Sequence, residues 1–350
     1  MKTLKQGRTS RIVTAASIVL AAGFPLGAPT SDEAVQLVFL PEEGSTLTYV
    51  LESNSTLELV ESSVVESMDG EERSMEPPET RELEQTERYT FVDEIVAVDK
   101  DRVTTLIRSF EEVHSEHDNV GTSGEEDWSD AHAGTSELHE AQIRFTWDDE
   151  AERYGCEPAD EELESDFDEE LLDGLELDVY LIGMLPEGEV SVGDTWEAEA
   201  TNYFRIMYPG GVLRIVSHEG DDPALDNGYE IRDAMEGDVS VTLLKVEDSE
   251  DGRVAVLGIE IDIECGTQSE SDIEWEGVGT GTNTVTLTIL TEVSGEARWS
   301  LDHNLPISLT LAGTQRYENE SAASISGEHD YESSYTTALD GEIEFELSWE

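Results

Sequence analysis

The chain has 350 residues, of which 83 are Asp or Glu and 19 are Lys or Arg, so its formal net charge is −64. A hydrophobic content of 37% suffices for a packed core, which excludes a chain that is disordered throughout. The acid surplus argues against a nucleic-acid or anionic-membrane partner and is typical of proteins from salty or divalent-rich surroundings, where the self-repulsion is screened.

The first residues predict a secretory signal peptide over residues 1–28. An apolar stretch, Ile12–Leu26, follows a basic segment, and no acid occurs before Asp32. The basic residues are Lys2, Lys5, Arg8 and Arg11. We expect an exported protein of the periplasm, the cell surface or the extracellular space; an uncleaved anchor is the alternative, and the cleavage site stays open. No later segment is apolar enough to span a membrane.

Period-2 alternation predicts antiparallel strands with one wet face along most of the chain. The clearest cases, in chain order, are Leu47-Tyr49-Leu51 with Leu57-Leu59, Ile143-Phe145-Trp147, Leu257-Ile259-Ile261-Ile263, Val285-Leu287-Ile289, Leu305-Ile307-Leu309-Leu311 and Ile343-Phe345-Leu347-Trp349. Polar turns at Asp99–Asp101, Asp248–Gly252 and Asp302–Asn304 predict hairpins. Glu61–Glu87 and Glu111–Thr135 are charge-dense or rich in Ser and Gly, and we expect loops there.

One helix is expected between two similar β-rich parts. Leu171, Leu175, Val179 and Ile182 share a helical face, and Pro186 ends the pattern. The prediction is a mainly β protein with antiparallel curved sheets or half-barrels in two similar halves. The boundaries are 29–158 for the N-terminal half, 159–185 for the acidic linker and helix, and 186–350 for the C-terminal half. The hairpins at Phe91–Phe110 and Val239–Ile263 suggest an internal duplication.

A segment after the helix carries a short motif. It runs Pro186-Glu-Gly-Glu-Val190-Ser-Val192-Gly193-Asp194-Thr195-Trp196. It resembles the P-x-x-x-V-x-V-G-D-x-W segment of bacterial secreted proteins and lipoproteins of unknown function, in which it introduces the second half of a β-rich domain. The resemblance implies a fold context and no activity. From the residues alone, Gly193-Asp194 predicts a tight turn, after which Trp196 anchors a strand.

The two cysteines, Cys156 and Cys265, predict a structural disulfide in an exported chain, with two unpaired thiols as the alternative. Four histidines gather among acids and form a candidate zinc or copper site: His114, His117, His132 and His139. A solvated histidine-containing loop is the alternative interpretation. No cofactor is otherwise expected. The segment that begins at Glu247 has Gly258 where an EF-hand needs a bidentate Glu and is better interpreted as a hairpin tip, but weak Ca²⁺ binding by acidic loops stays open.

No catalytic motif stands out, which favours a non-catalytic structural or binding role at the cell surface or in the periplasm. A second hypothesis is a carrier of an apolar ligand in a half-barrel, lined by aromatic residues that would otherwise be core. The lining would be Tyr49, Phe91, Trp147, Trp299 and Trp349. A third hypothesis is a metal-dependent hydrolase that uses the histidine-rich segment. The protein partner, if any, stays unknown.

Overall fold

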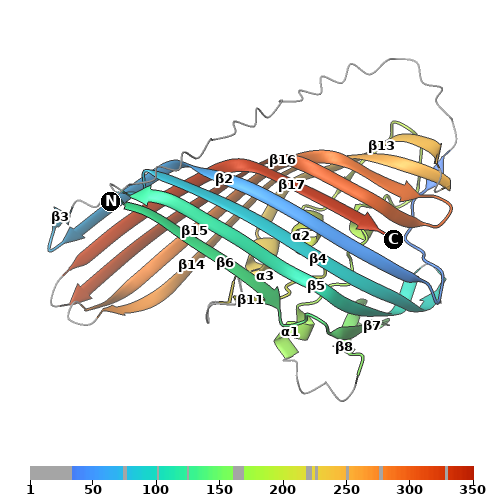
Figure 1. Ribbon diagram of the computed structural model, residues 1–350, viewed down its shortest axis with the longest axis horizontal. Helices are drawn as coiled ribbons and strands as arrows, with labels where there is room; N and C mark the ends of the chain where they lie inside the picture. The colour runs from blue at the N-terminus through green and yellow to red at the C-terminus, as the bar shows by residue number, and fades with distance from the viewer. Residues whose placement is uncertain are drawn as a thin grey trace, which may run out of the picture. The chain divides into compact units, whose positions relative to one another are not determined.

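The computed structural model describes residues 34–73, 77–100, 102–123, 126–160, 169–217, 223–224, 228–249, 252–275, 279–327 and 330–350, and these form one compact unit (Figure 1). The predicted signal peptide, residues 1–28, lies outside the described residues.

Strands dominate the unit, and the helices are short. The strands are β1 Val35–Gln36, β2 Thr46–Met68, β3 Glu71–Arg73, β4 Thr80–Asp99, β5 Arg102–Ser123, β6 Glu126–Ser136, β7 Gln142–Asp148, β8 Arg153–Pro158, β9 Glu189–Val190, β10 Thr195–Ala198, β11 Ile215–Ser217, β12 Pro223–Ala224, β13 Met235–Ser249, β14 Gly252–Trp275, β15 Gly279–Ser300, β16 Leu305–Gly327 and β17 Tyr331–Trp349. The helices are α1 Glu169–Asp173, the 3-10 turn η2 Ile182–Met184, α2 Thr201–Met207 and α3 Gly228–Asp233.

One antiparallel sheet of 15 strands contains all of these strands except β1 and β9, in the order β10-β13-β14-β15-β16-β17-β2-β4-β5-β6-β11-β12, with β3, β7 and β8 pairing beside it. This confirms the predicted mainly β, antiparallel fold. The order has two ends, so the sheet is open. The C-terminal strand pairs with the first long strand, from Trp349 opposite Tyr49 to Tyr331 opposite Met68. The two sequence halves therefore contribute adjoining strands of a single sheet.

Both segments predicted as loops are strands, and that prediction is wrong. Apart from residues 74–76 and 124–125, which are not described, most of Glu61–Glu87 belongs to β2 and β4, and most of Glu111–Thr135 belongs to β5 and β6. The physical reason is that these stretches are not packed against another layer, so an apolar alternation is not needed. Continuous backbone ladders to their neighbours hold them instead.

The predicted helix over residues 171–182 is also wrong. Between residues 169 and 185 only α1 and η2 are helical, and Leu181, directly before η2, adopts a left-handed conformation with φ 59° that a continuous helix would not allow. The Asp178 carboxylate also accepts backbone N–H groups from Tyr180, Ile182 and Gly183 at 3.0–3.1 Å, which favours a turn over a helix. Leu171, Leu175 and Val179 are nonetheless all buried, since the segment packs on the sheet.

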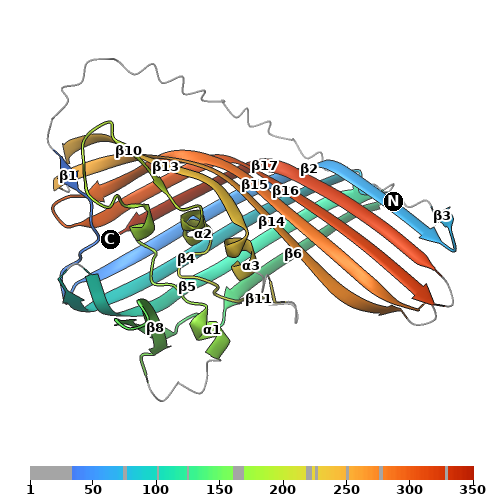
Figure 2. The ribbon, with the colours of Figure 1, turned by 180° about the vertical axis from the view of Figure 1, so that it is seen from behind.

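The described residues of 169–234, here called the insert, pack on one face of the sheet, the inner face, apart from the short strands β9–β12. Figure 2 shows α2 and α3 in front of the strands. The Tyr203 ring meets Phe345 edge-on at 6.1 Å, and the Trp349 indole N–H donates to the Val179 carbonyl at 3.1 Å. The core therefore lies between the insert and the half of each long strand that it covers.

Glycines let the sheet roll toward its inner face. A Cβ at Gly313 would collide with the Glu292 carbonyl oxygen and would lie 2.7 Å from the Val293 Cα. Far from the insert, the Trp275 ring on β14 meets the Tyr331 ring on β17 at 5.2 Å, across the two strands between them. Neighbouring strands are about 4.8 Å apart, so a flat sheet would hold these two strands about 14 Å apart. The contact therefore requires strong curvature.

Candidate ligand-binding face

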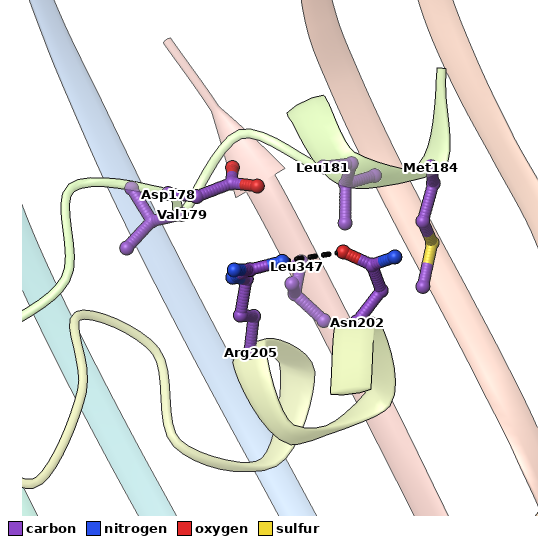
Figure 3. A pocket seen from close by; sticks show the side chains of 7 residues that line it. All are labelled: Asp178, Val179, Leu181, Met184, Asn202, Arg205 and Leu347. Atoms are coloured by element: carbon purple, nitrogen blue, oxygen red, sulfur yellow. Dashed lines mark hydrogen bonds between the residues drawn. The ribbon is translucent and has the colours of Figure 1, made fainter. Parts of the chain in front are cut away.

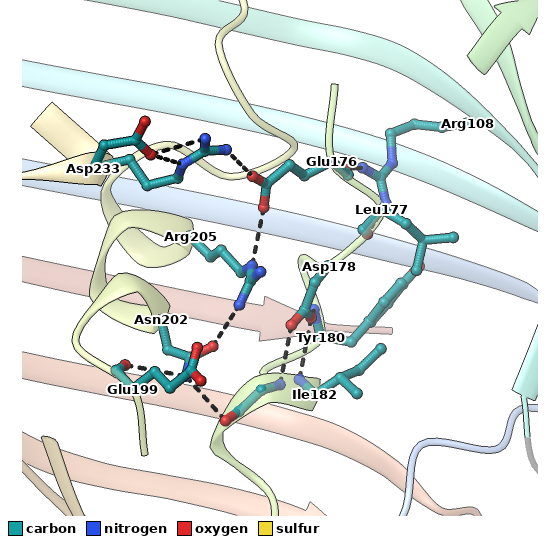
Figure 4. A network of polar contacts seen from close by, with 12 residues as sticks. Arg108, Glu176, Leu177, Asp178, Tyr180, Ile182, Glu199, Asn202, Arg205 and Asp233 are labelled. Atoms are coloured by element: carbon teal, nitrogen blue, oxygen red, sulfur yellow. Dashed lines mark hydrogen bonds and ion pairs between the residues drawn. The ribbon is translucent and has the colours of Figure 1, made fainter. Parts of the chain in front are cut away.

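A buried ion pair fixes the insert to the sheet, and Figure 4 shows one of its members, Arg108, beside Glu176 and Leu177 of the insert. The Arg108 guanidinium donates to both Asp93 carboxylate oxygens at 2.9 and 2.8 Å, and the two side chains are 0% and 1% exposed. The Tyr180 hydroxyl donates to the same carboxylate at 2.6 Å. Arg108 also donates to the carbonyls of Glu176 and Leu177. The two side chains are thus satisfied by each other and by the insert, which is what makes such burial tolerable.

A second layer of charges ties the insert together. The Glu176 carboxylate accepts from Arg205 at 2.9 Å and from Arg232 at 3.2 Å, and Arg205 donates to the Asn202 side-chain oxygen at 2.6 Å. In a chain with so few cations, these arginines are bound within the fold. These contacts join α2 and α3 to the segment around Glu176.

The space beside this network is too small for a ligand. Asp178, Leu181, Met184, Asn202 and Arg205 surround it, together with Val179 and Leu347 (Figure 3). Its volume is about 10 Å³, which is room for about one water molecule. A second depression, of about 660 Å³, is open to solvent beside the β7–β8 hairpin and is lined mainly by acidic and small residues around Trp147.

The inner face continues past the insert as a surface that no described helix covers, and we call this surface the open inner face. It consists of the inward-pointing alternate residues of Leu59–Met68, Tyr331–Leu339, Tyr317–Ile325, Gly281–Ile289 and Cys265–Trp275. Figure 2 shows these strands running beyond α3. Ile325 is 3% exposed and Leu287 is 8% exposed. Apolar side chains are therefore shielded here by the curvature of the sheet and by their neighbours alone.

The two faces of this region differ sharply in charge. Among these residues Glu66 is the only charged one, and its carboxylate accepts a hydrogen bond from the Tyr331 hydroxyl at 2.8 Å. Burial raises the pKa of Tyr317, and Arg81 on the adjoining strand β4 lies near enough for its charge to lower that pKa in part. Seven acids occupy the outer face of the same stretches: Glu61, Glu270, Asp272, Glu274, Glu318, Glu320 and Glu332. The inner positions instead carry aliphatic, tyrosine and hydroxyl side chains. Such a mixture of apolar and uncharged polar groups is typical of surfaces that bind an uncharged ligand.

Three adjacent strands align buried polar atoms on this face. Asn319 on β16 lies opposite Thr337 on β17, and Thr337 lies opposite Ser62 on β2. The Asn319 Oδ1, Thr337 Oγ1 and Ser62 Oγ atoms are buried, and none has a hydrogen-bond partner among the described residues. Buried polar atoms are paired in the great majority of cases, so a row of three unpaired atoms requires an explanation.

A partly exposed carboxylate lies at the boundary between the insert and β4. Gln85 donates to Glu87 at 2.8 Å, and Tyr89 also hydrogen-bonds to it. Burial raises the pKa of Glu87 to about 7, and these two hydrogen bonds lower it only in part. Tyr208, directly after α2, lies near enough for the Glu87 charge to help raise the pKa of its hydroxyl. Glu87 is therefore a group whose charge changes near neutral pH.

The four candidate histidines do not come together. His117 and His132 are cross-strand neighbours on the inner face with ring centroids 5.1 Å apart, and His132 pairs with Asp130 at 2.8 Å. Burial and the neighbouring His132 lower the pKa of His117. His114 points to the outer face and contacts Glu116 at 2.9 Å, and His139 lies exposed in a turn. Within the described ranges, no three His, Cys, Asp or Glu side chains are placed to share a metal ion.

Near the acidic hairpin tip, which does not fit an EF-hand loop, one carboxylate is already engaged. The Glu247 carboxylate accepts from Lys245 at 2.6 Å and from Arg298 at 3.1 Å. These two cations lower the pKa of Glu247. A Ca²⁺ ion at this position would have to displace both.

The predicted disulfide is wrong: both thiols are free. Cys265 lies on β14, where its thiol donates to the Ile231 carbonyl at 3.3 Å, whereas Cys156 lies on β8 beside Phe145. These strands belong to different parts of the sheet, so the two sulfur atoms cannot meet. Burial raises the pKa of the Cys156 thiol to about 12.

Most of the proposed aromatic lining is packed core. Tyr49, Phe91, Trp299 and Trp349 are between 0% and 8% exposed, and the Tyr49 ring stacks on Phe91 with centroids 5.3 Å apart. They lie beneath the insert, so a ligand cannot reach them. Trp147 lies away from this core, where Arg102 stacks over its ring at 4.3 Å.

The motif segment forms a turn and a short strand. Gly193 has φ +95°, and the Asp194 carboxylate accepts the Ser191 N–H at 2.8 Å. Trp196, in β10, donates its indole N–H to the Met184 carbonyl at 2.8 Å, just before Pro186. This arrangement joins the insert to the edge of the sheet and leaves the indole nitrogen occupied.

The chain matches no known family model, and a search of curated proteins returned no match. In the part of the chain that the structure describes, no helix is long and apolar enough to cross a membrane.

Proposed function

We propose that this protein is an exported, non-catalytic binding protein that carries an amphiphilic small molecule on its open inner face. The observation that supports the proposal is the composition of that face: aliphatic, tyrosine and hydroxyl side chains with a single acid, in a chain of net charge −64. A bound amphiphile would cover the apolar area of this face that is still exposed, which is worth about 25 cal/mol per Å² removed from water.

Export is part of the proposal and is supported by the basic and apolar residues within 1–28. The acidic outer face supports a soluble, salt-tolerant carrier, because like charges keep copies apart. A carrier also explains why the long strands extend far beyond the core that the insert completes. A purely structural role would leave this length without a purpose.

Native mass spectrometry of the chain, produced with export and kept in moderate salt, tests the proposal. We expect a co-purifying mass of several hundred daltons. Val285→Arg places a bulky cation on the open inner face and should abolish that mass, whereas Thr286→Arg, the next residue on the outer face, should retain it. A bare polypeptide mass together with no uptake of added amphiphiles would contradict a carrier and favour the structural role. A stoichiometric metal mass would instead favour the hydrolase hypothesis.

A further inference from the structure

The unpaired polar row on the open inner face indicates what the ligand's polar part must be. Thr337 is 3% exposed, and its Oγ1 has no hydrogen-bond partner among the described residues. Asn319 lies opposite Thr337 on β16, and Ser62 lies opposite Thr337 on β2. The Asn319 Oδ1 and Ser62 Oγ atoms are also buried and also have no hydrogen-bond partner among the described residues. We propose that Ser62, Thr337 and Asn319 bind the uncharged, hydroxyl-bearing head of a neutral amphiphile, such as a monoacylglycerol. This inference rests on the proposed function and assigns the ligand class at that same face.

Hydrogen-bond chemistry selects a ligand that both donates and accepts. The Asn319 oxygen only accepts, so the ligand must present an O–H or N–H group to it. The Ser62 and Thr337 hydroxyls can each donate or accept, so they suit a second hydroxyl or an ester carbonyl. A head group with adjacent hydroxyl and ester oxygens can satisfy all three atoms at once.

Hydrogen bonding and electrostatics both disfavour a charged head. A carboxylate cannot donate to the Asn319 oxygen, and it would enter a protein that carries 83 acids and 19 bases. An ammonium group would need a buried anion beside it. The acid on this face, Glu66, is four residues along β2 from Ser62, about 13 Å at strand spacing, and it is bonded by Tyr331.

The surroundings provide for the acyl chain. Leu287 is the cross-strand neighbour of Asn319, and Leu339 and Tyr335 are inner-face neighbours of Thr337 along β17. The polar row therefore has apolar side chains on both sides along the strands. At the far end, the Trp275–Tyr331 contact leaves an indole that can report on occupancy.

Binding of three ten-carbon amphiphiles to the full chain tests the inference. The probes are 1-monodecanoylglycerol, decanoate and decyltrimethylammonium, measured by calorimetry and by tryptophan fluorescence. We expect the neutral glyceride to bind at least tenfold more tightly than either ion. Thr337→Val, which keeps the shape and removes the hydroxyl, should weaken glyceride binding about three- to tenfold. Thr336→Val, on the outer face of the same strand, should not change it.

A stability measurement separates lost binding from misfolding. Thr337→Val removes an unpaired buried hydroxyl, so we expect its melting temperature without ligand to stay level or rise while its glyceride affinity falls. Equal binding of all three probes, or an unchanged affinity of Thr337→Val, would overturn the assigned head group while leaving the carrier function intact. Failure of all probes, with no co-purifying mass, would overturn both and would leave ordered water as the partner of the row.

Discussion

Arg108 and Asp93, on neighbouring strands, form a two-point ion pair at 2.9 and 2.8 Å that is excluded from solvent and completed by the Tyr180 hydroxyl. The pair thereby joins the sheet to the insert. Removing one member leaves the other charged, buried and unpaired. We therefore expect Asp93→Asn to lower the free energy of unfolding by about 3–5 kcal/mol, measured by urea denaturation in moderate salt.

The control for this prediction is an exposed ion pair on the outer face. Arg88 and Glu52 approach to 3.9 Å with 51% and 57% of their side chains exposed. Solvent screens such a pair, so Glu52→Gln should leave the urea midpoint nearly unchanged. Equal losses in the two variants would show that the buried pair has no special role.

The strands beneath the insert could be predicted from the sequence, because burial of one face makes apolar and polar residues alternate along them. Leu47, Tyr49 and Leu51 point into the core, and the turn after Asp99 joins paired strands as predicted. Beyond the insert, packing no longer imposes a pattern: Ser62 and Glu66 share a face on β2 with apolar residues. The same sequence that resembles a loop therefore forms a strand through its backbone partners.

The candidate site was hidden from sequence analysis for a related reason. Ser62, Asn319 and Thr337 lie in two distant parts of the chain, and only the strand register brings them into one row. Each is an ordinary surface residue type when considered alone. The disulfide prediction failed likewise, since Cys156 and Cys265 satisfy the composition rule and lack only proximity. In both cases the order and register of the strands, which the sequence pattern does not reveal, determine which residues meet.

Glu87 should make stability depend on pH. Its carboxyl group has a folded-state pKa of about 7 against a reference value of 4.5. Between these values the folded protein retains a proton that the unfolded chain releases, so stability falls as the pH rises through this window. Glu87→Gln should remove the effect and be more stable than the parent by about 2 kcal/mol at pH 8, with little difference at pH 4.5.

Urea titrations at pH 4.5, 6, 7 and 8 measure this difference directly. Glu58→Gln removes one charge from an exposed outer-face position and controls for the general effect of reducing the net charge. A gain from Glu87→Gln that matched the Glu58→Gln gain at every pH would rule out a special role for the Glu87 carboxyl group.

Salt should stabilise the protein by screening alone. The Debye length falls from about 10 Å at 0.1 M to about 3 Å at 1 M, which reduces repulsion among the outer-face acids. We expect the melting temperature to rise steadily over this range in NaCl, and by a similar amount in choline chloride. A rise confined to millimolar Ca²⁺ would instead indicate a specific cation site.

Both thiols should be free in protein prepared by export. In urea, a thiol reagent should titrate two groups per chain, and a reducing agent should leave the melting temperature unchanged. Under native conditions at pH 8 we expect slow alkylation, because burial raises the pKa of Cys156 to about 12 and also raises that of Cys265. A titre of zero in urea would contradict the separation of the two strands.

The rolling of the sheet depends on glycines at inner-face positions, and Gly313 tests this dependence. A methyl group there would collide with the Glu292 carbonyl oxygen on the neighbouring strand, so Gly313→Ala must push the strands apart. We expect a loss of about 2 kcal/mol or more in unfolding free energy. Gly266→Ala is the matched control, since no atom lies within 4 Å of its added Cβ; there alanine should stabilise by up to about 1 kcal/mol.

Because the curvature brings Trp275 onto Tyr331, the tryptophan emission of Gly313→Ala should also shift to longer wavelength, whereas that of Gly266→Ala should not. A stable Gly313→Ala variant with unchanged emission would mean that the sheet does not need this close approach to roll.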